Sequence, residues 1–287
     1  MTETFRHQRT IAKRAEITGF GYWTGRDTHV QFEPAEPGSG IVFVRRDLSG
    51  QTRIPALVQN RIEIPRRTAL GCCCATVEMV EHIMAALAGL QIDNCEVWVD
   101  GAEMPGMDGS SWPFVEVLDE AGVEQQDAIR PTLVIDDVTR VGDTNSWVEA
   151  KPAAENVFSI RCRIDYSSVP SIGRQTYEAI VTPEVFREEL SKCRTFLLRE
   201  EAEWLVAQGL GSRATCKDVL VFEDDGPIDN TLRFENECVR HKALDLIGDL
   251  ALAGCDLVGQ ITSQRSGPRL NAEIVKAIAK EGQVIQS

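Results

Sequence analysis

The residues best suited to chemistry in this sequence are its histidines, of which there are only four: His7, His29, His82 and His241. His82 and His241 both fall in segments whose apolar residues recur at helical spacing. Asp245 follows His241 by four residues, so the imidazole and the carboxylate share one face of a helix. If the two helices face each other, two nitrogens and one oxygen converge and leave a fourth position open to water. That is the composition of a catalytic zinc site.

Glu81 directly precedes His82 and would act at such a site as the general base that takes a proton from a zinc-bound water. Each of these features also has an ordinary structural explanation. A histidine among apolar residues is often a core side chain, and a His241–Asp245 pair is often a surface ion pair worth ~0.3–0.5 kcal/mol. Spacing alone therefore leaves the triad a hypothesis, in which iron could replace zinc because affinity alone does not fix the metal.

Alternating and helical patterns predict the elements that must position these residues. The predicted strands lie at 10–18, 29–32, 41–45, 95–100 and, in the second half, within 132–180. The predicted helices lie at about 76–89, from Ser110 or Ser111 to Gly122, from Thr182 onward, at 199–208 and around His241. The acidic stretch 223–229 is interpreted as a solvated loop.

A boundary between two domains is predicted in the polar segment 124–130, which divides the chain into residues 1–128 and 129–287. Each half has strands first, then a long helix, an Ala-Gly stop and a closing strand. This shared order indicates two similar α+β units.

The net charge of the chain limits the classes of molecule that we expect it to bind. Thirty basic and 44 acidic residues give a formal net charge of −14. A protein that binds nucleic-acid backbones needs a basic stripe, so we expect no nucleic-acid partner. A small anionic ligand is compatible with the composition, because a few lysines can line one cleft of an acidic protein.

The sequence also predicts a cytoplasmic protein with at most peripheral membrane contact. No stretch reaches the ~20 apolar residues that span a bilayer, and Met1 to Arg14 lacks the hydrophobic core of a signal peptide. Nine cysteines without an export signal indicate mostly reduced thiols. The consecutive Cys72, Cys73 and Cys74 are interpreted as small buried apolar residues, because adjacent residues do not readily turn three sulfurs onto one metal.

Four motifs stand out along the chain: Gln8-Arg9-Thr10-Ile11, Val80–Asn94, Met107-Asp108-Gly109-Ser110 and Phe234–Leu250. Together they resemble the signature of the UDP-3-O-acyl-N-acetylglucosamine deacetylases, the zinc amidohydrolases of lipid A synthesis. The resemblance runs in order from about residue 8 to residue 272 and is longest around His241. On these motifs the sequence is identified as a member of that superfamily.

The resemblance implies an α+β fold of two similar domains in a β-α-α-β sandwich, with the helices packed between two small sheets. It implies that His82, His241 and Asp245 hold Zn²⁺ and that Glu81 is the general base. The implied substrate is a UDP-sugar or acylated amino sugar. Its acyl chain would enter a passage formed by an inserted segment of the second domain, at about residues 164–195.

Three further roles come from the resemblance. Thr195 matches a threonine that steadies the oxyanion, and Lys242 matches a lysine near the substrate. Asp249 matches an aspartate that orients a catalytic histidine. A zinc ion and a hydroxyl donor at the developing alkoxide are what amide hydrolysis requires.

The histidine that Asp249 would orient is missing. The family's Ser-Gly-His near the C-terminus reads Ser266-Gly267-Pro268 here, and proline has no titratable group. Other departures predict a changed pocket: Gly19-Phe20-Gly21-Tyr22-Trp23 replaces Gly-x-Gly-Leu-His, and Gly211-Ser212-Arg213-Ala214 replaces a Gly-Gly-Ser region.

Two functions remain open on the sequence. The first is a zinc deacetylase with weakened or altered-substrate activity, in which Glu81 carries the proton to the amine; losing one general acid typically costs ~10²–10⁴-fold. The second is a paralogue that binds zinc and a sugar nucleotide or lipid without turnover. Retention of Glu81 favours the enzyme. The oligomeric state is left open.

Overall fold

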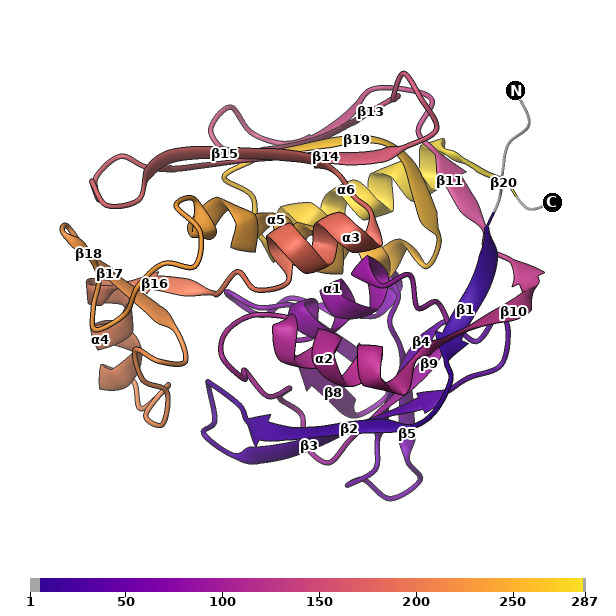
Figure 1. Ribbon diagram of the computed structural model, residues 1–287, viewed down its shortest axis with the longest axis horizontal. Helices are drawn as coiled ribbons and strands as arrows, with labels where there is room; N and C mark the ends of the chain where they lie inside the picture. The colour runs from indigo at the N-terminus through magenta and orange to yellow at the C-terminus, as the bar shows by residue number, and fades with distance from the viewer. Residues whose placement is uncertain (1–5, 286–287) are drawn as a thin grey trace.

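Two sheets enclose a layer of helices in the computed structural model, which describes residues 6–285 (Figure 1). The N-terminal sheet has the strand order β2-β3-β9-β4-β5. Its strands are β2 (Ala15–Phe20), β3 (Asp27–Pro34), β9 (Cys95–Val99), β4 (Ile41–Arg45) and β5 (Thr52–Pro55).

The C-terminal sheet follows the path β12-β13-β19-β11-β20, and β14 also pairs with β19 and with β15. These strands are β11 (Thr132–Val134), β12 (Thr139–Gly142), β13 (Trp147–Lys151), β14 (Phe158–Tyr166), β15 (Gly173–Ile180), β19 (Asp256–Gln264) and β20 (Gln283–Ile285).

The helices come from both halves of the chain. They are α1 (Glu81–Gly89), α2 (Trp112–Ala121), α3 (Pro183–Val185), α4 (Arg199–Ala207), α5 (Glu237–Leu250) and α6 (Pro268–Glu281). A π turn, Phe186–Leu190, continues α3, and 3₁₀ turns lie at Val58–Asn60 and Ala251–Ala253.

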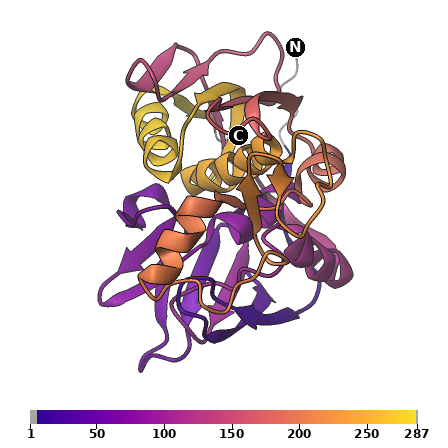
Figure 2. The same cartoon turned by 90° about the vertical axis from the view of Figure 1, so that its left-hand side faces the viewer.

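Three small sheets complete the fold. They are β1 (His7–Ile11) with β10 (Val123–Ile129), β6 (Arg61–Ile62) with β7 (Ala69–Cys72) and β8 (Ala75–Glu78), and β16 (Phe196–Leu198) with β17 (Leu220–Glu223) and β18 (Gly226–Pro227). Figure 1 shows β16–β18 and α4 projecting at one end of the helical layer. Figure 2 faces that end and shows the orange α4 in front.

The layering follows from the residue patterns. β9 alternates buried and half-buried residues, as a strand with one face on a core does. α1 buries eight of its nine residues, because it lies between the two sheets and packs against α5. The predicted α+β sandwich, with helices between two sheets, is therefore confirmed.

Some predicted boundaries are wrong. The helix expected from Thr76 begins at Glu81, because Ala75–Glu78 pairs with β7 as a strand. Met79 has a φ of 59° and separates that strand from the helix. The predicted strand 10–18 is two strands, and the acidic stretch 223–229 is not simply a loop, since Glu223 pairs with Gly226 in a hairpin.

Of the predicted boundary segment 124–130, all but Arg130 belongs to strand β10, which pairs antiparallel with β1. The predicted division at 128/129 therefore falls near the end of this strand, and we keep the two-domain organisation as a prediction. Across residues 6–285, no helix combines the length and apolarity needed to cross a membrane.

The interpretation of the cysteine triplet as buried is wrong. Cys73 and Cys74 are exposed because they form the turn between β7 and β8, and Cys72, the last residue of β7, is partly buried. Cys73 has a φ of 58°, which is the left-handed backbone that a tight hairpin turn requires.

Candidate metal centre and active site

The contact between α1 and α5 positions the candidate site. Glu81 and His82 begin α1, while His241 and Asp245 lie one turn apart on α5. Gly248 permits the close approach of the two helices, since a Cβ at this position would lie 2.2 Å from the backbone oxygen of Glu81. The two helices therefore bring His82 and His241, which are 241 − 82 = 159 positions apart in the sequence, to one place.

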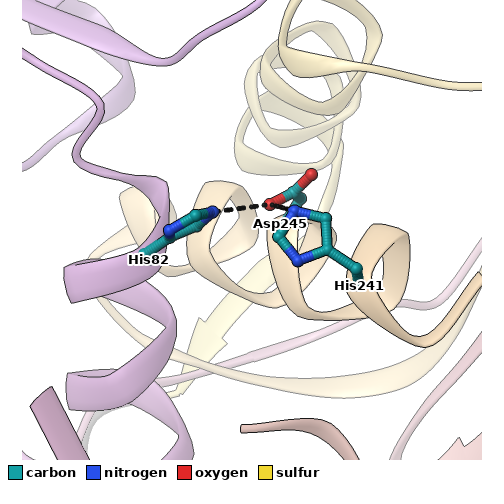
Figure 3. Close-up of side chains that lie close together, drawn as sticks. All are labelled: His82, His241 and Asp245. Carbon is teal, nitrogen blue, oxygen red and sulfur yellow. Dashed lines mark ion pairs between the residues drawn. The ribbon is translucent and has the colours of Figure 1, made fainter. Parts of the chain in front are cut away.

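His82, His241 and Asp245 converge on one point (Figure 3). The Oδ1 atom of Asp245 lies 3.3 Å from Nε2 of His241 and 3.6 Å from Nε2 of His82. One ligand atom from each residue lies within 4.8 Å of the other two. The two imidazole rings are 5.1 Å apart and nearly perpendicular, at 87°.

This donor set fits a metal ion. Asp245 Oδ1 is buried and accepts no hydrogen bond from any of the residues 6–285, so a cation would satisfy it. His241 Nδ1 lies 3.0 Å from the carbonyl oxygen of Cys193, which leaves the Nε2 lone pair free for a metal when Nδ1 carries the hydrogen. Two nitrogens and one carboxylate oxygen are ligands that zinc and iron both accept.

The pKa values of His241 and Asp245 also suit metal binding. Burial lowers the pKa of His241 to about 4, so its imidazole is neutral near pH 7, as metal coordination requires. Burial alone would raise the pKa of Asp245, but His241 and Lys242 hold that pKa well below its usual range. Lys242 Nζ donates to Asp245 Oδ2 at 2.9 Å.

Glu81 lies beside these ligands and is 9 % exposed. The backbone N–H of Thr68 donates to its Oε2 atom at 3.0 Å. Burial raises the pKa of Glu81 to about 7, which suits a group that both takes up and releases a proton near neutrality.

A cavity of about 750 Å³ opens beside the triad and is lined by Glu81, His82, Thr195, Lys242 and Pro268, among others. Thr195 is held by its backbone N–H, which donates to the carbonyl oxygen of Gly109 at 2.8 Å. The structure thus brings together Glu81, Thr195 and Lys242, three residues predicted for the site.

The apolar wall of the cavity comes mainly from residues 196–228, and its members are Phe196, Leu197, Ala202, Leu205, Val206, Leu210, Ala214, Val219, Val221 and Ile228. Of the segment 164–195, predicted to form an acyl passage, only Tyr166 and Thr195 line the cavity. Most of that segment is instead used by β14, β15 and the helical turns after them. An ion pair of 3.0 Å between Arg66 and Glu201 joins the N-terminal half to α4 beside the cavity.

Asp249 lies behind the cavity and has partners that the sequence did not predict. Thr68 Oγ1 donates to its Oδ1 at 2.5 Å, and Asn271 Nδ2 donates to its Oδ2 at 2.8 Å. Asn271 is one helical turn after Pro268 on α6, a spacing that could have indicated it. No sequence signal marks Thr68, because it lies in a loop far from Asp249 in the chain.

Pro268 is the first residue of α6 and lines the cavity. Proline fits this position in a helix, because its missing N–H is not needed there. Pro268, which stands where the family motif has a histidine, therefore lines the same cavity as Glu81.

Comparisons with known proteins agree with these observations. The family model described as UDP-3-O-acyl N-acetylglycosamine deacetylase matches residues 8–280. Two proteins named UDP-3-O-acyl-N-acetylglucosamine deacetylase, from Brucella ovis and Brucella canis, are each 40% identical to this chain over 277 residues. The match covers 96% of this chain and 96% of each relative.

Proposed function

Because the chain belongs to the UDP-3-O-acyl-N-acetylglucosamine deacetylase family, we propose that it is a zinc-dependent amide hydrolase acting on an acylated, UDP-linked amino sugar. The observation that carries the proposal is the convergence of His82, His241 and Asp245 beside Glu81. Three ligands with a carboxylate base next to them form the arrangement of a catalytic zinc site.

His82, His241 and Asp245 would hold the metal. When bound, zinc supplies Lewis-acid polarisation of the amide carbonyl and lowers the pKa of water. Lys242 keeps Asp245 ionised through the 2.9 Å contact with its Oδ2, so the carboxylate is ready to bind a cation.

Glu81 takes the proton from the attacking water and delivers it to the leaving amine. Its position at the cavity wall and its pKa near 7 support both steps. The Thr195 hydroxyl stabilises the negative charge that develops on the amide oxygen, and Lys242 provides a positive charge at the same wall.

The cavity supports a substrate with an apolar arm and an anionic part. Its wall of leucines, valines and other apolar residues suits an acyl chain. Arg66, Arg67, Arg199 and Lys242 also line it and suit a diphosphate. We propose that the acyl chain lies along α4 and β17.

Turnover is proposed to be weak on the usual family substrate. Pro268 lines the cavity and has no proton to donate, and the loss of one general acid typically lowers the rate by ~10²–10⁴-fold. The same observation supports a second candidate function, a protein that binds zinc and a sugar nucleotide or lipid without turnover. The retained Glu81 supports the enzyme, because a binding protein needs no base.

A cytoplasmic location is part of the proposal. Its support is that the nine cysteines are all free thiols, of which Cys73 and Cys74 are exposed in the turn after β7. Free thiols persist in a reducing compartment.

The test of the proposed function is release of acetate from UDP-3-O-acyl-N-acetylglucosamine by the zinc-loaded chain, beside the variant Glu81→Ala. We expect slow release that depends on Glu81. Substrate binding by calorimetry without acetate release would favour the second candidate. Release that is equally fast in Glu81→Ala would contradict the role of Glu81 in both steps.

A further inference from the structure

We propose that Thr68 is the positioning residue for the base Glu81, and that Asp249, which has no histidine to orient in this chain, holds Thr68 in place. The proposal rests on the proposed function, since it takes Glu81 as the base. It concerns four residues from four parts of the chain: Thr68, Glu81, Asp249 and Asn271.

Thr68 donates hydrogen bonds to two different carboxylates. Its backbone N–H donates to Glu81 Oε2 at 3.0 Å, and its hydroxyl donates to Asp249 Oδ1 at 2.5 Å. The residue is only 1 % exposed, so water does not compete for either contact. One residue thus links the carboxylate on α1 to the carboxylate on α5.

Asp249 is itself held in place. Asn271 on α6 donates to Oδ2 at 2.8 Å, and both Asp249 and Asn271 are almost completely buried. Each carboxylate oxygen of Asp249 therefore has a donor from this chain. The aspartate keeps a structural task in a protein that has Pro268 in place of the family's histidine.

The loop before β7 depends on this anchor. Thr68 lies between the turn at Arg66, whose φ is 66°, and the first residue of β7, Ala69. The carbonyl oxygen of Thr68 accepts from Val80 N at a longer 3.3 Å. The hydroxyl contact to Asp249 is the shortest of the three, so it fixes where the N–H that holds Glu81 is placed.

The consequence for catalysis is geometric. A base works only within hydrogen-bond reach of the proton that it removes, and small displacements of catalytic groups lower rates strongly. Removing the hydroxyl should loosen the loop and move the Glu81 carboxylate. Removal should leave the metal ligands in place, because within residues 6–285 Thr68 makes no hydrogen bond to His82, His241 or Asp245.

The experiment compares Thr68→Val, which keeps the shape and removes the hydroxyl, with Thr68→Ser, which keeps the hydroxyl. The matched control is Thr10→Val. Thr10 is also buried, and its hydroxyl donates to the carbonyl of Asn94 at 2.7 Å, in a strand away from the site. All variants are full-length and zinc-loaded, and their melting temperatures are recorded.

We expect Thr68→Val to lower kcat ~10–100-fold, as loss of a supporting contact around a metal site does, with KM and zinc content unchanged. Thr68→Ser should restore kcat, and Thr10→Val should lower only the melting temperature. If Thr68 had only a structural role, Thr68→Val and Thr10→Val would change kcat and the melting temperature in the same way. That result would overturn the proposal.

A second readout separates this proposal from the proposed function. Crystal structures of Thr68→Val and Thr68→Ser should show the Glu81 carboxylate displaced from the residue 68 N–H in the first variant and in place in the second. If the native chain has no turnover at all, the proposed function fails, and this comparison still decides the Thr68 proposal. An unmoved Glu81 in Thr68→Val would overturn it.

Discussion

At the scale of single residues, the site depends on Asp245 Oδ1, which lies between the Nε2 atoms of His241 and His82 at 3.3 and 3.6 Å. A buried carboxylate oxygen without a donor is unfavourable unless a cation balances it. His241 is made ready for that cation by the contact of its Nδ1 with the Cys193 carbonyl. The geometry therefore favours a bound metal over an empty cluster of buried groups.

The first prediction is loss of the metal in His241→Ala. Removing a direct ligand should lower zinc affinity by more than the ~10–100-fold typical of supporting contacts. Elemental analysis should find about one zinc per native chain and little in the variant. The matched control is His29→Ala, since His29 lies on β3 and is a histidine outside the triad. Full zinc content in His241→Ala would show that the metal binds elsewhere.

The second prediction concerns Pro268→His. An imidazole at this position could contact Asp249, because a carboxylate with two donors, Thr68 and Asn271, has room for a third. We expect turnover to rise by up to ~10²-fold, which is the low end of the range that a general acid contributes. The gain should be limited because α6 begins at this residue and the backbone must adjust to the loss of proline. The measurement is kcat at fixed zinc content. A native rate that already matches a histidine-bearing relative would contradict the assigned defect.

The third prediction is a pH dependence of stability in the metal-free chain. Burial, with a smaller contribution from nearby Glu81, raises the pKa of Asp249 to about 7, whereas an unfolded aspartate ionises near pH ~4. Between these values the folded state holds a proton that the unfolded state has lost, so the free energy of unfolding falls as pH rises. This contribution is fully present below pH ~4 and is lost as pH rises through about 7.

Asp249→Asn should remove the part of this pH dependence that comes from Asp249, because an amide does not titrate. The new amide oxygen can still accept from Thr68, and the new N–H group can donate to Asn271 once the Asn271 amide turns over and presents its Oδ1, which has no donor within residues 6–285. The measurement is urea unfolding at about pH 4, 5.5 and 7, which correspond to the pKa of the unfolded aspartate, an intermediate pH and the pKa of folded Asp249. The free energy of unfolding should decline less with rising pH in the variant than in the native chain. Equal declines would mean that Asp249 does not titrate in this range.

At the scale of elements, the α1–α5 contact decides whether the site exists. At Gly248 the backbone of α1 lies too close for a side chain. The fourth prediction is that Gly248→Ala separates the helices, since the new Cβ would meet the Glu81 backbone oxygen at 2.2 Å and Ala85 N at 3.0 Å. We expect a destabilisation of ~1–3 kcal/mol and weaker zinc binding, because the ligands come from both helices.

The control is Gly101→Ala, where a Cβ would make only ordinary contact with Thr28 at 3.5 Å. Thermal unfolding and zinc titration of both variants would check the prediction. If Gly248→Ala binds zinc as tightly as the native chain, the contact does not set the ligand geometry.

The elements also explain what the sequence could and could not predict. The i, i+4 pair His241 and Asp245 was predictable, because helix geometry alone puts both on one face. The start of α1 was not, since Thr76 and Val77 fit the helical period by coincidence and pair with β7 instead. Thr68 was invisible, because its role comes from contacts with α1 and α5 that no local pattern encodes.

At the scale of the whole molecule, the two sheets hold the helices of both halves against each other, so the site lies where the halves meet (Figure 1). The sandwich was predicted through the family resemblance and is confirmed. The resemblance predicted an acyl passage at about 164–195, and that passage stays a prediction. The apolar wall of the cavity comes mainly from 196–228, and the sequence did not indicate it because the packing of α4 and β17 around the cavity depends on tertiary structure.

The most direct test of the central claim is a zinc titration of the metal-stripped chain, with acetate release from UDP-3-O-acyl-N-acetylglucosamine as the signal. We expect release to rise with added zinc and to level off at about one equivalent, because a single three-ligand site binds one ion, and to be absent in Glu81→Ala and His241→Ala. Release that is independent of added zinc, or no release at saturating zinc, would contradict that claim.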